Sequence, residues 1–201
     1  MFFRRCSIGL ASASVLLLAS VGKMAAMSDD GVGPEDGRHT PVSVDDVVPD
    51  FEVTLEGRTW KLSELRQNKD MTADGTLVLT FWCSTCESCR LVEGDLEELA
   101  RRYRGKAAVI AVDSNFGETR EEVAAFAKKR GLTLPIALNA SGSAADVFGV
   151  SATTTTAVID STGRLRYLGQ FGDGGHAYAH DALEAVLAGK EVSTKSTRPK
   201  G

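Results

Sequence analysis

Apolar and polar residues alternate along residues 51–56, with the period of two that is typical of a strand with one buried face. Gly57 interrupts this alternation, which resumes at Trp60 and Leu62 and predicts a second short strand. Residues 63–69 are then predicted to form a short helix or turn. The fold is therefore expected to begin with two short strands that are close in sequence.

Two continuous apolar runs, residues 76–82 and 107–112, have the length of strands but no alternation. Runs of this kind predict central strands that are buried on both faces of a sheet. Between them, residues 86–104 carry apolar residues at helical spacing, and Gly105 is the expected end of this helix. The apolar residues of the helical stripe are Val92, Leu96, Leu99, Ala100 and Tyr103.

A second helix is predicted after the second apolar run. Thr119 and Glu122 have the spacing of a capping box, in which each side chain bonds to the backbone N–H of the other residue. The basic residues 128–130 fall in the last turn, where the negative end of the helix dipole favours them, and Gly131 is the expected cap. The predicted inward residues are Val123, Phe126 and Ala127.

The rest of the chain predicts a strand, a hairpin and a last helix. The elements are a strand at 134–138, a short helix at 144–148, strands at 155–160 and 164–170, and a helix at 177–188. The residues between the last two strands, Ser161, Thr162 and Gly163, are typical of a hairpin turn.

The order of these elements predicts the fold class. Strand–helix–strand units cross over right-handed onto a mostly parallel sheet, and the closing hairpin adds antiparallel strands. We therefore expect an α/β protein with a thioredoxin-like fold, in which helices flank a central mixed sheet that has extra N-terminal strands. The domain is predicted to span residues 42–189, followed by a loose polar tail at 190–201.

The N-terminal residues have the pattern of a targeting segment. Arg4 and Arg5 precede an uncharged run of 14 residues, 8–21, which is shorter than the roughly 20 residues of a membrane span. Residues 1–27 are therefore predicted to be a signal peptide or, as the alternative, an uncleaved N-terminal anchor. Residues 28–41 are rich in Gly and Asp and are predicted to be a flexible linker. This predicts a periplasmic or otherwise extracytoplasmic protein, with membrane anchoring through residues 8–21 left open.

Composition narrows the function classes. The chain has 201 residues, 43% hydrophobic and 25% charged, which excludes a collagen, a coiled coil and a wholly disordered chain. The formal net charge is −4, and the Lys and Arg residues are scattered, so no nucleic-acid partner is expected.

The candidate chemistry lies in three cysteines, Cys83, Cys86 and Cys89, where an apolar strand gives way to a helix. The first turn of a helix has unpaired N–H groups and a partial positive charge, which stabilise a thiolate. A second cysteine three residues later lies one turn further on and is placed to close an intramolecular disulfide. This spacing occurs twice, as Cys83–Cys86 and as Cys86–Cys89, and the spacing alone does not choose between them.

The segment LVLTFWCSTCESCR, residues 77–90, resembles the active site of extracytoplasmic thioredoxin-like oxidoreductases of the TlpA/ResA kind, within the redoxin (AhpC/TSA) superfamily. The resemblance extends over about residues 47–188. It implies that Cys86 is the attacking thiol and Cys89 the resolving thiol. It also implies that Trp82, Thr85 and Thr154 line the docking surface for a partner. The role of Cys83 remains open: it either packs as a small apolar residue, exchanges disulfides with Cys86 or joins a metal site.

Three departures from the family pattern modify this interpretation. Glu87 stands beside the thiols where relatives have proline, and its charge disfavours a thiolate whereas that of Arg90 favours one, which predicts a weak oxidant. Thr154 occupies the position of the family's cis-proline. Thr80 replaces the buried Asp that serves as proton acceptor in thioredoxins proper.

The resemblance implies an exported thiol–disulfide oxidoreductase that needs no cofactor and no metal. Its partners are proteins that carry disulfides or thiols, together with an upstream electron donor. One alternative is a peroxiredoxin-like thiol peroxidase, for which Thr80 and Cys83 supply half of the signature. Another is a copper-binding assembly factor on the same fold, with His176 and His180 as candidate ligands.

Overall fold

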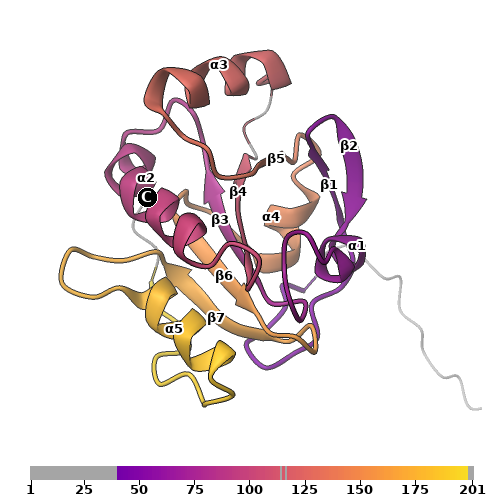
Figure 1. Ribbon diagram of the computed structural model, residues 1–201, viewed down its shortest axis with the longest axis vertical. Coiled ribbons are helices and arrows are strands. Elements are labelled where there is room, and N and C mark those ends of the chain that lie inside the picture. The colour runs from indigo at the N-terminus through magenta and orange to yellow at the C-terminus, as the bar shows by residue number, and fades with distance from the viewer. Residues whose placement is uncertain (1–39, 114, 116, 199–201) are drawn as a thin grey trace, which may run out of the picture. The chain divides into compact units, whose positions relative to one another are not determined.

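The computed structural model describes residues 40–113, 115 and 117–198, and these residues fold around one seven-stranded sheet (Figure 1). The strands are β1 (Glu52–Leu55), β2 (Arg58–Lys61), β3 (Leu77–Trp82), β4 (Ala108–Asp113), β5 (Ile136–Leu138), β6 (Thr155–Ile159) and β7 (Leu165–Gln170). The helices are α1 (Leu62–Gln67), α2 (Glu87–Arg102), α3 (Arg120–Arg130), α4 (Ser143–Phe148) and α5 (Tyr178–Leu187).

The sheet is mixed, with the strand order β2-β1-β5-β4-β3-β6-β7. Strands β3, β4 and β5 are parallel, and β1, β2, β6 and β7 pair antiparallel with their neighbours. Helix α2 connects the parallel strands β3 and β4, as a crossover between parallel strands requires. This arrangement confirms the predicted α/β class and the extra N-terminal strands.

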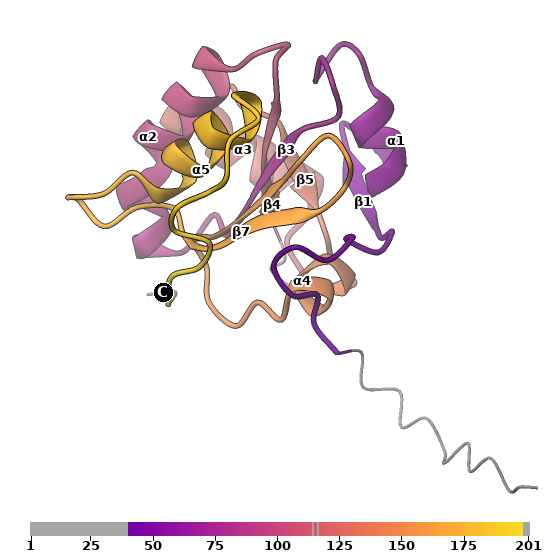
Figure 2. The ribbon, with the colours of Figure 1, turned by 90° about the horizontal axis from the view of Figure 1, so that it is seen from below.

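Two hydrophobic cores lie on opposite faces of the sheet (Figure 2). One contains residues of α1 and α4, and the other contains residues of α2, α3 and α5. Strand β3 supplies both, because its side chains alternate between the faces: Leu79 and Phe81 enter the first core, and Val78 and Trp82 enter the second. This double burial explains the continuous apolar run in the sequence.

The predicted ends of α3 are confirmed. The backbone N–H of Glu122 donates to the Thr119 hydroxyl at 3.3 Å, and the Glu122 carboxylate accepts from the Thr119 N–H at 2.8 Å. Gly131 ends the helix in the left-handed conformation, with φ 71°. Strand β5 is shorter than predicted and begins after Pro135, which has no N–H to donate to a neighbouring strand.

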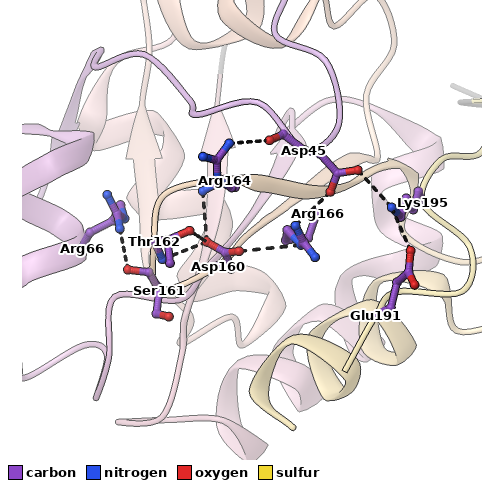
Figure 3. Close-up of polar contacts among 9 residues, drawn as sticks. All are labelled: Asp45, Arg66, Asp160, Ser161, Thr162, Arg164, Arg166, Glu191 and Lys195. Atoms are coloured by element: carbon purple, nitrogen blue, oxygen red, sulfur yellow. Dashed lines mark hydrogen bonds and ion pairs between the residues drawn. The ribbon is translucent and has the colours of Figure 1, made fainter. Parts of the chain in front are cut away.

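The prediction of a loose polar tail is wrong for residues 192–197. Val192 is buried, Ser196 forms a parallel bridge with Leu168 of β7, and Lys195 lies 3.0 Å from the Asp45 carboxylate (Figure 3). Asp45 also accepts from Arg166 at 2.9 Å, so the tail, β7 and the segment before β1 are joined. The tail covers the edge of β7, whose backbone groups need partners that a hydrophobicity pattern does not reveal.

The predicted signal or anchor at 1–27 lies outside the described residues, as does the predicted linker except for residues 40 and 41. Val42 makes the first backbone link to the domain, from its N–H to the Val147 carbonyl at 2.8 Å. In the part of the chain that the structure describes, no helix has both the length and the apolar character that crossing a membrane requires.

Candidate active site

Strand β3 and helix α2 together position the cysteines. Strand β3 ends at Trp82, and α2 begins at Glu87 with Cys86 as its N-cap. The Cys86 N–H donates to the Cys83 carbonyl at 3.3 Å, which forms a turn between the two elements. Cys86 therefore lies at the helix N-terminus and Cys89 in the first turn, as the sequence predicts.

The Cys86 thiol is partly exposed and electrostatically activated. Its Sγ lies 3.0 Å from the Thr153 hydroxyl. Partial burial raises the pKa of Cys86, but hydrogen bonds from Thr153, from the backbone and thiol of Cys89, and from the Ser88 backbone outweigh burial and lower the pKa to about 7. About half of Cys86 is therefore a thiolate at neutral pH.

The Cys89 thiol has the opposite environment. It is 0% exposed, and burial raises its pKa to about 12, against weaker lowering contributions from the Cys83 backbone and the Thr153 hydroxyl. The neighbouring Cys86 raises this pKa further. Cys89 is thus protonated at neutral pH, and the two thiols of one helical turn differ in both exposure and charge.

Thr153 contacts the Cys86 sulfur, and its replacement tests that contact. Thr153→Val is expected to raise the pKa of Cys86 from about 7 by roughly one unit, because a hydrogen bond to a charged acceptor is lost. The pH dependence of the ultraviolet thiolate absorbance measures this shift. Thr153→Ser keeps the hydroxyl and is the matched control, so an equal pKa in the two variants would contradict the assignment.

Thr154 does not reproduce the backbone of the family's proline. Its φ is 62°, its N–H donates to the Phe81 carbonyl at 2.7 Å, and its carbonyl accepts from the Phe171 N–H at 3.1 Å. Proline has no N–H and a φ near −65°, so it does not fit this geometry. A β-branched residue in the left-handed region costs about 1–2 kcal/mol. The contact with Cys86 comes instead from the neighbouring Thr153.

Trp82 departs from the expectation that it lines a docking surface, because it is only 2% exposed. Its indole N–H donates to Glu93 Oε1 at 3.0 Å, and the same oxygen accepts from Arg130 Nη1 at 2.5 Å. Sequence reasoning missed Glu93 and Arg130. The sequence does contain a sign of this contact. Glu93 falls on the inward-facing stripe of α2 with Cys89 and Leu96, and a carboxylate that is buried there needs a polar or charged partner.

The remaining predicted site residues are exposed or half-buried. Cys83 is half-buried, and its Sγ lies 3.1 Å from the hydroxyl of the exposed Thr85. Glu87 and Arg90 are exposed, and neither is among the main causes of the pKa of Cys86. Solvent therefore screens the charges that the sequence placed beside the thiols.

The residues of the two alternative functions are not brought together. The Thr80 hydroxyl bonds to Thr156 at 3.0 Å rather than to Cys83, so the half-signature of a peroxidase does not form a contact. His176 precedes α5 and stacks on Tyr178, whereas His180 contacts Tyr103. Within residues 40–113, 115 and 117–198, no three or more His, Cys, Asp or Glu side chains are grouped to hold a metal ion.

A pair of carboxyl groups near the cysteine loop, the buried Asp113 and the half-buried Glu118, was also missed by sequence reasoning. Asp113 ends β4 in register with Trp82 and is 2% exposed. Burial, together with a hydrogen bond and repulsion from Glu118, raises the pKa of Asp113 to about 7. Burial also acts on Glu118, but hydrogen bonds from Ser84, Asp113 and Asn115 outweigh it and lower the pKa of Glu118. From about pH 7 down to the lowered pKa of Glu118 the pair therefore holds one proton, and Ser84 links the pair to the loop before Cys86.

Asp113→Asn is expected to stabilise the protein at pH 8 by about 1–3 kcal/mol. Asp113 binds its proton more tightly when folded, with a pKa of about 7 against an ordinary 3.8, so stability is lost as pH rises through this window. An asparagine N–H replaces the proton toward Glu118, and the gain should disappear near pH 4. Urea unfolding at both pH values measures it, with the exposed Asp70→Asn as control. No gain at pH 8 would refute a shared proton.

These observations define a class of protein. A thioredoxin-like sheet carries two thiols on the first turn of a helix, of which one is accessible and activated and the other is buried. The fold and the site are those of a thioredoxin-like oxidoreductase. The sequence matches the AhpC/TSA family over residues 44–168, which is more than half of the chain, and the chain belongs to this family.

Known proteins support this assignment. The thioredoxin-like protein YneN of Bacillus subtilis (strain 168) is 31% identical over 161 residues, which cover 77% of this chain and 85% of the relative. The thiol-disulfide oxidoreductase ResA of Geobacillus thermodenitrificans (strain NG80-2) is 31% identical over 128 residues, which cover 63% and 69% of the two chains. The crystal structure of a hypothetical protein from Sinorhizobium meliloti 1021 matches with a TM-score of 0.68 and 29% identity, over 81% and 93% of the two chains.

Proposed function

We propose that the protein exchanges disulfides with protein partners through Cys86 and Cys89. The observation that carries the proposal is the contrast between the two thiols. Cys86 is partly exposed with a pKa of about 7, and Cys89 is fully buried with a pKa of about 12. An accessible thiolate is suited to attack a partner, and a protected thiol one turn away is suited to release it.

The reaction follows from these positions. The Cys86 thiolate attacks a partner disulfide, forming a mixed disulfide while the other partner sulfur leaves as a thiolate and takes up a proton. Cys89 then loses its proton and attacks Cys86 Sγ, which closes the Cys86–Cys89 disulfide and releases the second partner sulfur as a thiolate. The partner gains two electrons and the protein loses two. An upstream dithiol donor restores the protein by the same exchange, and the opposite direction uses the same steps.

The second step becomes easier once the first has occurred. The hydrogen bond and charge of Cys86 both raise the pKa of Cys89 in the reduced protein. In the mixed disulfide Cys86 carries no negative charge, so both contributions are removed and Cys89 ionises more readily. The order of attack is thereby built into the pair, with Cys86 reacting first.

The pKa of Cys86 also supports a redox potential of the Cys86–Cys89 pair that is closer to that of a reductant than to that of a strong oxidant. A pKa of about 7 is close to that of thioredoxin, whereas a strong oxidant such as DsbA has a thiol pKa near 3.5. We further propose an extracytoplasmic location, supported by the targeting pattern of residues 1–27. Residues 8–21 then serve either as part of a cleaved signal or as a membrane anchor.

Trapping the mixed disulfide tests the proposed function. Cys89→Ser expressed in the source cell is expected to accumulate a disulfide between Cys86 and its partner, because the resolving thiol is absent. The adduct should disappear on reduction and should be absent from the matched variant with both Cys86→Ser and Cys89→Ser. If Cys89→Ser forms no adduct, or forms it through Cys83, the proposed roles of the two thiols are wrong.

A further inference from the structure

A cavity of about 820 Å³ opens beside the dithiol. One wall is a face of α2, the other is the loop of residues 172–177 between β7 and α5, and Thr154 also lines the cavity. We call this cavity the α2–α5 groove. Ser88, which lies between Cys86 and Cys89, lines it, so the groove begins at the site where a partner disulfide would react.

The α2 wall of the groove is an uncovered helix face. Its lining residues recur every three or four positions, which places them on one side of the helix: Ser88, Leu91, Asp95, Glu98 and Arg102. Leu91 is 81% exposed, and among the described residues Val47 is the only other large hydrophobic residue that is exposed. The groove therefore offers an apolar contact one turn beyond the cysteines.

The unpaired charge of the groove is negative. Asp95, in the middle of the α2 wall, has no hydrogen bond or ion pair with any described residue, whereas Glu98 is bridged by Arg101 at 2.6 Å. The one guanidinium of the lining, Arg102, already lies 3.8 Å from Glu184. Across the groove, hydrogen bonds from Gly175, Tyr178 and His176 lower the pKa of Asp173 to about 2, so Asp173 stays ionised.

The two histidines that line the groove do not make its unpaired charge positive. His176 lies 3.2 Å from the Asp173 carboxylate, and His180 lies 3.3 Å from that of Asp181. Each adds positive charge only in its protonated form, and each then faces a carboxylate that is already present. A groove with unpaired carboxylate charge and an exposed leucine is complementary to a segment with both basic and apolar side chains.

We propose that the α2–α5 groove binds an extended segment of the partner protein that carries a Lys or Arg about three residues from its reactive cysteine. This rests on the proposed function and names the substrate class of the same site. Cys86 and Asp95 are nine helical residues apart, or about 13 Å, which is spanned by about three residues of extended chain together with the reach of a Lys or Arg side chain. Leu91 contacts the side chain between them, and the loop glycines at 174 and 175 leave room for the partner's backbone.

Paired peptide substrates test the proposal. Each peptide carries one cysteine as a mixed disulfide, with either Lys or Glu three residues away on each flank, and the reduced protein supplies the electrons. We expect the Lys peptide to react about 3–10 times faster than the Glu peptide at low salt, with the difference shrinking at high salt. Asp95→Lys should abolish or reverse this preference. Glu121→Lys makes the same charge change at an exposed position of α3 and should leave the preference unchanged.

Reduction of a small disulfide that carries no peptide distinguishes a failure of the groove proposal from a failure of the proposed function. If the wild-type protein reduces the small disulfide but treats both peptides equally, the groove proposal is overturned and the proposed function stands. If Asp95→Lys keeps the full preference for Lys, the groove proposal is also overturned. If the wild-type protein does not reduce the small disulfide at all, the proposed function itself fails. Dimerisation that is abolished by Asp95→Lys would assign the groove to a second copy and overturn the proposed occupant.

Discussion

Iodoacetamide at pH 7 is expected to modify Cys86 about 10³ times faster than Cys89. About half of Cys86 is thiolate at this pH, because its pKa is about 7, whereas a pKa of about 12 leaves roughly 10⁻⁵ of Cys89 ionised. The Cys89 thiolate is more basic than that of Cys86 and is therefore intrinsically more nucleophilic, by a factor of about 200 over five pKa units. This partly offsets the small ionised fraction of Cys89. Complete burial of Cys89 then slows its reaction further.

Mass spectrometry of the alkylated peptides measures both rates on the reduced protein. The rate at Cys86 should fall about tenfold per unit of pH below 7 and level off above it, since only the thiolate reacts. In urea both cysteines should react at similar rates, which controls for their intrinsic reactivity. Equal rates in the folded protein, or faster reaction at Cys89, would reverse the assigned order of attack.

Arg130→Met is expected to lower the free energy of unfolding by about 3 kcal/mol, because it leaves the buried Glu93 carboxylate without its counter-charge. The exposed fractions of the Arg130 and Glu93 side chains are only 20% and 10%. The contact also connects α3 to α2 and, through the Trp82 indole, to the end of β3. A loss of this size corresponds to a fall in Tm of roughly 6–12 °C for a domain of this length.

A double-mutant cycle identifies the cause of this loss. Glu93→Gln keeps an oxygen for Trp82 but removes the buried charge, so Arg130→Met should cost only about 1 kcal/mol in the Glu93→Gln background. Arg101→Met breaks the exposed pair with Glu98 and serves as a matched control, with an expected cost below about 0.5 kcal/mol. An equal cost of Arg130→Met in both backgrounds would show that packing, not charge, stabilises this contact.

The sequence located the dithiol because that information is local. Strand β3 is a continuous apolar run and α2 follows with helical periodicity, so spacing places the cysteine cluster at a helix N-terminus. The resemblance of residues 77–90 to a known active site then selected Cys86 and Cys89 from the three cysteines. The capping box at Thr119 and Glu122 is equally local and is confirmed. Such features depend on residues within one or two helical turns of each other.

The partners of buried polar groups are not local, and the sequence missed them. Glu93 and Arg130 are separated by 37 positions, and Cys86 and Thr153 by 67. No periodicity marks such pairs, because each forms only when separate elements pack together. Arg130 illustrates this, since its place in the last turn of α3 predicted an interaction with the helix dipole but its guanidinium binds Glu93.

By itself the sequence determined the fold class, the order of the elements and the position of the cysteine cluster, because periodicity and spacing act along the chain. Only the tertiary structure decided which threonine contacts the reactive sulfur, which carboxyl groups share a proton and which helix face stays open beside the cysteines. The strength of a charge or hydrogen bond depends on solvent exclusion, and packing of distant segments creates that exclusion.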